Sequence, residues 1–520
     1  MLACIREPGR IEERPSLESL LAGLDRSQLQ ALVVWLVERW PDLIDAIEAK
    51  LQASFATPTV SLAPPAQAGP TAAKDEALRQ RRTPVDTTVY RRQVRVALHS
   101  LDRMRASEAY WHVGEVVDEI RQVLRQAQDF VTAGDGRTAL AILEAITEEY
   151  MAGWIYLDDS DGEASAFFAD MAPVWTEALL TADLTLEERQ AWARKLTKWQ
   201  GELDNYGVEE AFDAALAAAH QGWDSPPLVR VLQGKITEKG VWEGEAPWFA
   251  DDLAVARLNV LERQGRYQEY LYLAEAEGQT ERYVTMLVRL GRVQEAVNYG
   301  LQYLDTPEEA LTLAKALRER EEFQNALRIA EYGLSLQGPR APLATWLSEL
   351  ALGMGEAEKA LEAATIAFRD SPTLSAYLRV KHLADTRWPE IKQDLLAYLK
   401  GKGYIENKVD IYLEEGMVNE AVQVVDTQPY MGYGVLERVV DAAIQSHPDW
   451  VIQQCRQQAE SIMDQGKSRY YDHAVRWLEK ARAAYRAVDR EAEWQAYLHQ
   501  LITHHRRKYS LVPRLEALRR

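Results

Sequence analysis

Apolar residues recur with a helical period along most of this chain, and a short six-residue phrase separates successive helical segments. Between residues 253 and 372 the copies advance by about thirty residues each time. They read GRYQEY at 265–270, GRVQEA at 291–296, EEFQNA at 321–326 and GEAEKA at 355–360. A phrase that returns at this interval between amphipathic segments predicts an all-α protein built as an α-solenoid of helical hairpins.

The residue types at the two ends of the phrase each have a physical reason. A glycine at the first position tolerates the positive φ with which a helix ends. A small residue at the last position lets the backbones of two helices approach closely. Further copies at 134–139, 416–421 and 469–474 extend the array on both sides. The predicted packing residues are Ala139, Ala296, Ala326, Ala360, Ala421 and Ala474.

The unit that ends at Pro372 resembles a tetratricopeptide repeat. Ala360, Ala364 and Ala367 fall on one helical face, and the proline follows Ala360 by twelve residues. The resemblance implies TPR-like hairpins whose groove holds a protein or peptide partner. The alternative is a globular domain of ordinary amphipathic hairpins.

Composition shifts divide the chain into five predicted parts. Segment 1–55 reads as a small N-terminal helical unit, and 56–88 as a linker rich in Pro and Ala. Segment 89–225 reads as a helical domain with an early copy of the repeat. Segment 226–252 contains several glycines and predicts an irregular joint, with two short strands as an alternative. Segment 253–520 is the predicted TPR-like solenoid.

The order of these parts resembles bacterial SWIM zinc-finger proteins downstream of their finger. An Arg-, Glu- and Pro-rich stretch at 6–15 precedes a leucine-rich hairpin, and the helical order of the C-terminal region also matches. The resemblance implies a zinc held by a Cys-x-Cys and Cys-x-His motif. Here Cys4 stands alone and neither half of the motif occurs. We therefore expect no metal and no cofactor in this chain, with zinc only if a finger lies upstream.

The chain is strongly acidic. Its formal net charge is −20 and its pI is about 5.1, which disfavours binding to nucleic acid or to anionic membranes by the protein as a whole. Its two cysteines, Cys4 and Cys455, are too few for a disulfide framework and favour a cytoplasmic location. No run of eighteen apolar residues occurs, so we expect no membrane association.

One stretch of this acidic chain is basic. Arginines gather between residues 79 and 105, and the predicted helix that follows Val89 carries a polar stripe beside its apolar one. The candidate contacts for an anion or nucleic acid on that stripe are Arg91, Arg92, Arg95, His99 and Arg103. The alternative is a solvated face that pairs with Glu and Asp of neighbouring helices.

An Asp-rich string at 156–163 suggests a calcium loop, because Asp159, Asp161 and Gly162 match three positions of an EF-hand. The first and last ligand positions would be Leu157 and Phe168, which cannot bind calcium. We therefore interpret the string as a turn whose Asp and Ser side chains cap the next helix.

No nucleotide-binding glycine loop, metalloprotease motif or nucleophile elbow occurs in the chain. Nine dispersed histidines include one adjacent pair, His504 and His505, which in a continuous helix would point to different faces. We expect no enzymatic activity. The predicted function is a helical-repeat scaffold for protein–protein interaction. The alternative is a nucleic-acid-associated protein that uses the basic stripe near 91–105 together with a zinc finger missing from this chain.

Overall fold

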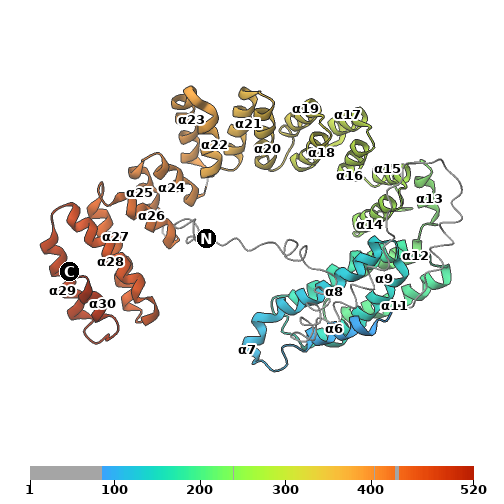
Figure 1. Ribbon diagram of the computed structural model, residues 1–520, viewed down its shortest axis with the longest axis horizontal. Coiled ribbons are helices and arrows are strands. Elements are labelled where there is room, and N and C mark those ends of the chain that lie inside the picture. The colour runs from blue at the N-terminus through green and yellow to red at the C-terminus, as the bar shows by residue number, and fades with distance from the viewer. Residues whose placement is uncertain (1–84, 238, 403, 428–431, 520) are drawn as a thin grey trace, which may run out of the picture. The chain divides into compact units, whose positions relative to one another are not determined.

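The computed structural model describes residues 85–237, 239–402, 404–427 and 432–519 (Figure 1). Within these ranges the chain forms helices and turns and no strands, which confirms the prediction of an all-α, TPR-like solenoid. The predicted helical unit at 1–55 and all but the end of the predicted linker at 56–88 lie outside the described residues. In the described part, no helix combines the length and the apolar character needed to cross a bilayer.

The chain divides into two compact units, one extending to Tyr283 and the other beginning at Val284. The division falls within helix α16 (Thr280–Arg289). Helix α14 (Ala250–Arg263) belongs to the first unit, because it packs against α10 (Glu163–Thr181) and α12 (Asp213–Gln221) of that unit.

The first unit is organised around α10 (Glu163–Thr181), which packs against α8, α9, α12 and α14. Besides α10 and α14, its α-helices are α6 (Thr88–Leu98), α7 (Ala106–Ala109), α8 (Val113–Thr132), α9 (Gly136–Gly153), α11 (Leu186–Asp204), α12 (Asp213–Gln221), α13 (Pro226–Leu232) and α15 (Tyr267–Ala276). Short 3-10 turns at Tyr110–His112 and Trp154–Tyr156 lie between them.

Helix α10 can take this central place because apolar residues surround most of its circumference. Trp175 is fully buried, and its ring centroid lies 5.4 Å from that of Trp192 and 5.7 Å from that of Trp199, both on α11. The Trp175 indole N–H donates to Thr147 Oγ1 of α9 at 3.1 Å. A buried indole with its one donor satisfied fixes three helices relative to one another.

The joint at 226–252 begins with α13 and continues as turns up to α14. The alternative of two short strands is wrong for its described residues. The joint is held by Glu277, whose carboxylate accepts from the backbone N–H of Val241 at 2.9 Å and from the indole N–H of Trp242 at 3.1 Å. Burial raises the pKa of Glu277.

The second unit is a succession of hairpins in which each helix packs mainly on the next one or two along the chain (Figure 1). This pattern of neighbour contacts is what a solenoid requires. After α16 its α-helices are α17 (Val293–Tyr303), α18 (Pro307–Glu319), α19 (Phe323–Gly333), α20 (Ala341–Gly353), α21 (Ala357–Asp370), α22 (Leu374–Ala384), α23 (Trp388–Gly401), α24 (Ile405–Glu414), α25 (Val418–Asp426), α26 (Tyr433–Ala443), α27 (Pro448–Asp464), α28 (Tyr471–Ala487), α29 (Glu491–His504) and α30 (Val512–Ala517). Short 3-10 turns at Asp385–Arg387 and Ser468–Tyr470 precede α23 and α28.

The repeated phrase forms one kind of turn. Its first residue has a left-handed φ, for example 80° at Gly291, and the N–H of Arg292 donates to the Leu287 carbonyl at 2.9 Å. This bond and that from Gly291 to Val288, at 3.0 Å, are the pair that defines a Schellman helix end. The prediction that the phrase needs a residue of positive φ is confirmed, because the same conformation occurs at Gly134, Gly265, Glu321, Gly355 and Gly416.

The copy assigned to 469–474 does not form this turn. The residue of positive φ there is Gly466, and the 3-10 turn at Ser468–Tyr470 intervenes before α28. A copy absent from the sequence analysis lies between α28 and α29, where Asp489 has a φ of 54° and the Arg490 N–H donates to the Tyr485 carbonyl at 2.9 Å. This turn lacks both the glycine that begins the phrase and the alanine that ends it, since Trp494 stands at the last position.

Candidate functional sites

The six predicted packing alanines are all fully buried in the structure. They are Ala139, Ala296, Ala326, Ala360, Ala421 and Ala474. Close packing extends to glycines on the second helix of a hairpin. A methyl group placed on Gly333 would lie 2.4 Å from the Ala310 side chain of α18. The hairpins therefore pack at distances that only small side chains permit.

The predicted basic stripe is largely paired within the first unit. Arg91 lies 2.5 Å from Glu148 of α9, and Arg95 forms two hydrogen bonds of 2.6 and 2.9 Å to Glu149 of the same helix. His99 Nδ1 lies 3.0 Å from Asp102. Arg92 and Arg103 are exposed. Two of the five candidate residues, Arg91 and Arg95, thus join α6 to α9 through ion pairs. Pairing of this kind is what the alternative interpretation describes, in which the basic face pairs with Glu and Asp of neighbouring helices.

The Asp-rich string caps α10. Asp159 Oδ1 accepts from the backbone N–H of Ala164 at 2.7 Å and of Ser165 at 3.2 Å. Asp161 accepts from the Tyr110 hydroxyl at 2.6 Å. The interpretation of this string as a turn that caps the next helix is confirmed for Asp159. The Ser160 hydroxyl donates to Asp158 and not to the helix.

Three hairpins of the second unit present equivalent side chains to solvent from their first helices, α18, α20 and α22. The fifth and ninth residues of each helix lie one turn apart on the same face. We call these residues the first-helix row, and all of them are exposed or half-buried. The row consists of Leu311, Lys315, Thr345, Glu349, Leu378 and His382.

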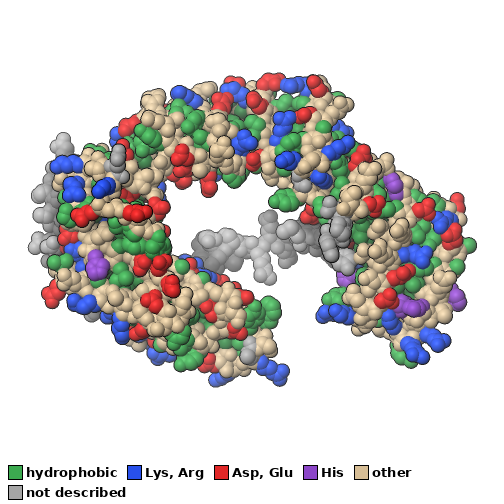
Figure 2. Space-filling view, turned by 180° about the vertical axis from the view of Figure 1, so that it is seen from behind, with side chains coloured by type: hydrophobic (Ala, Val, Ile, Leu, Met, Phe, Trp, Pro, Cys, Tyr) green, Lys and Arg blue, Asp and Glu red, His purple; other side chains and the backbone are tan. Residues whose placement is uncertain are grey.

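The row is mixed in character. Leu378 is 37% exposed, and charged or polar residues surround the two leucines along the row. On the face shown in Figure 2, apolar side chains likewise lie among charged ones over the hairpins. Single apolar side chains among polar ones are ordinary on protein surfaces, so the row is distinguished by its repetition and not by its composition.

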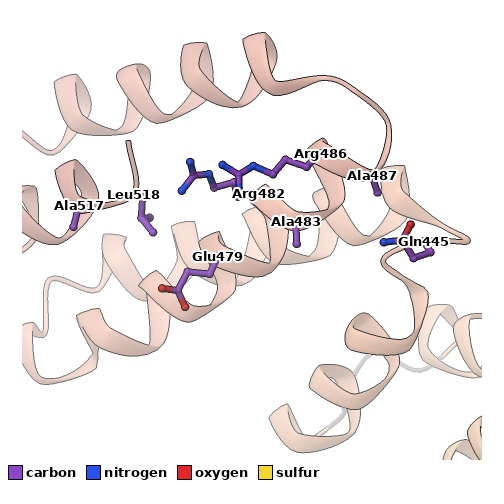
Figure 3. Close-up of a pocket in the computed structure, with 8 residues that line it drawn as sticks. All are labelled: Gln445, Glu479, Arg482, Ala483, Arg486, Ala487, Ala517 and Leu518. Atoms are coloured by element: carbon purple, nitrogen blue, oxygen red, sulfur yellow. The ribbon is translucent and has the colours of Figure 1, made fainter. Parts of the chain in front are cut away.

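A hollow of about 610 Å³ lies between α28, the end of α30 and Gln445 (Figure 3). Arg482 and Arg486 line it from successive turns of α28 and share one carboxylate. The Nε atoms of Arg482 and Arg486 lie 3.8 and 2.9 Å from Glu491. Arg482 Nε finds no hydrogen-bond partner among the described residues. Glu479 also lines the hollow, so its lining carries both signs of charge.

The adjacent histidines near the C-terminus come together in the structure. The His504 and His505 ring centroids lie 4.7 Å apart, edge to face. Helix α29 ends at His504, and His505 follows in a non-helical conformation. His504 is exposed, whereas His505 is buried. His505 is buried, and that burial lowers the pKa of its imidazole. Its Nε2 lies 3.9 Å from Asp464 Oδ1 at the end of α27.

Comparisons with known proteins add little. No family model matches the chain, and no curated protein matches it. Among solved structures it is similar to a protein described as "Circular tandem repeat protein with novel repeat topology and enhanced subunit contact surfaces". The sequence identity is 15%, over 92% of this chain and 99% of that chain, with a TM-score of 0.22. A likeness of that size carries no argument, so the fold assignment depends on the helices and turns described above.

Proposed function

We propose that this chain is a non-enzymatic helical-repeat scaffold that binds a protein or peptide partner along the first-helix row. The observation that carries the proposal is the repetition of equivalent solvent-facing positions on α18, α20 and α22. Stacked hairpins place such positions at regular intervals, so that one extended partner can contact several of them together.

The hairpins that carry the row are held in register, which lowers the entropic cost of binding. The Arg318 guanidinium lies 5.4 Å from the centre of the Trp346 ring, which joins α18 to α20. Lys359 pairs with Glu331 at 2.8 Å, and Arg387 pairs with Glu358 at 2.8 Å, between successive hairpins. A partner therefore meets a surface whose spacing is already set.

The charge of the chain indicates the chemistry of the partner. With a net charge of −20, the protein attracts a basic segment and repels an acidic one over the range of a Debye length. Leu311 and Leu378 would supply apolar anchors. We therefore propose a partner segment that carries both lysine or arginine and apolar side chains.

The resemblance to SWIM zinc-finger proteins fits this proposal, with the chain corresponding to the helical region downstream of their finger. The alternative nucleic-acid function is less favoured. Phosphate contacts by Arg91 and Arg95 would have to replace their ion pairs with Glu148 and Glu149.

Site-specific photo-crosslinking in extracts of the source organism tests the scaffold. A crosslinking residue at Thr345 or Leu378 should capture the same partner from both positions. The matched controls are Gln324 and Glu362, which are exposed on the second helices α19 and α21. Leu378→Asp should abolish capture at Thr345 while circular dichroism stays unchanged. Equal capture from row and control positions, or no specific capture from the row, would contradict the proposal.

A further inference from the structure

Two helices of the second unit end at one point beside a pair of imidazoles. Helix α27 ends at Asp464 and helix α29 ends at His504. The carbonyl end of a helix carries a negative partial charge, so two such ends together favour a cation. One cation already lies at this point, since the Lys508 ammonium donates to the Met463 carbonyl of α27 at 2.6 Å.

The side chains at this point carry the donor atoms that transition metals prefer. One ligand atom each from Asp464, His504 and His505 can be chosen so that all three lie within 4.8 Å of one another. Around a tetrahedral Zn²⁺ with bonds of about 2.0–2.2 Å, donor atoms lie roughly 3.3–3.5 Å apart. Asp464 and His504 are exposed and free to turn inward by the remaining distance, whereas buried His505 supplies a fixed point.

We propose that Asp464, His504 and His505 bind a divalent transition-metal ion of the Zn²⁺ type, which joins the ends of α27 and α29. Two imidazole nitrogens and one carboxylate oxygen form a ligand set that suits zinc, cobalt or nickel better than calcium or magnesium. With three protein donors, the fourth tetrahedral position is left to water. The site is separate from the Cys-x-Cys and Cys-x-His motif of SWIM fingers and uses none of its residues.

Calorimetric titration of the untagged full chain with Zn²⁺ tests this site, since a polyhistidine tag would bind the metal itself. After removal of bound metal by a chelator, one ion should bind per chain. Titration with Co²⁺ should give the visible absorption of a tetrahedral complex with nitrogen and oxygen ligands. Zn²⁺ should also raise the melting temperature, because it binds the folded chain.

Substitutions at two exposed positions distinguish loss of the metal site from loss of the folded structure. His504→Ala and Asp464→Asn should each weaken Zn²⁺ binding by about tenfold or more and leave circular dichroism unchanged. The matched control is His499→Ala, an exposed histidine of α29 outside the cluster, which should bind Zn²⁺ like the unchanged chain. Absence of Zn²⁺ binding, or equal binding by His504→Ala and His499→Ala, would overturn the proposal.

Discussion

Single residues set the turns on which the hairpins depend. A left-handed φ is nearly free for glycine, whereas it brings the Cβ of any other residue close to the following carbonyl oxygen. Gly291 and Gly355 occupy such positions at no steric cost. Glu321 occupies the equivalent position between α18 and α19 with a φ of 64°. The packing of this hairpin must therefore hold a residue in a conformation that its side chain disfavours.

Glu321→Gly should stabilise the second unit by about 1 kcal/mol, because it removes the steric cost of a left-handed non-glycine residue. Chemical denaturation followed by circular dichroism measures the difference.

The reverse substitution at the next equivalent turn is the control. Gly355 has a φ of 81° and open space where a Cβ would lie, so Gly355→Ala introduces only the backbone strain. It should destabilise the unit by a similar amount. Stabilisation by both substitutions, or by neither, would refute the conformational explanation.

At the scale of helices, a few starts are fixed by capping side chains, as they are at Asp135, Thr185, Thr306 and Thr373. Helix α11 begins with a capping box, in which Thr185 and Glu188 each accept the other's backbone N–H. Glu188 also binds Arg137 of α9 through two hydrogen bonds of 2.7 and 2.9 Å. The hydrogen bonds from Arg137, and to a smaller extent the one from the backbone N–H of Thr185, lower the pKa of Glu188 to about 2.

The lowered pKa makes this helix start sensitive to pH. The carboxylate stabilises the fold fully above its unfolded pKa of about 4.5, and this contribution is lost as the pH falls toward about 2. Glu188→Gln should therefore lower the melting temperature at pH 7, with a difference that shrinks between pH 4.5 and pH 2. Glu187→Gln, on the exposed neighbour, is the control. A constant difference across this range would exclude the ion pair as its cause.

Over the whole molecule, the two compact units are built on different principles. The first unit gathers helices that are distant in sequence around α10, whereas helices of the second pack on their neighbours along the chain. A core of distant contacts unfolds as one body, whereas a solenoid gains its stability from neighbouring pairs.

Core truncations in each unit test this separation. Trp175→Ala should destabilise the first unit by about 3–5 kcal/mol and raise amide exchange in α8–α12 while leaving α18–α21 unchanged. Trp494→Ala, at a fully buried position of the second unit, should raise exchange in α27–α29 and leave α8–α12 unchanged. Exchange that rises in both units after either substitution would show that they unfold together.

The sequence by itself determined the all-α class, the hairpin repeat and the buried alanines, because helical period, glycine at helix ends and small residues at close contacts are local signals. It also determined that Asp159 caps a helix, since a capping side chain lies within a few residues of the helix start that it caps.

Only the tertiary structure decided the contacts between residues that are distant in sequence. Glu148 and Glu149 pair with arginines more than fifty positions earlier. Arg482 and Glu479 line a hollow to which the end of α30 also contributes residues, and Asp464 approaches His505 across two helix ends. The membership of α14 in the first unit was likewise decided by its contacts with α10 and α12, which no local pattern records.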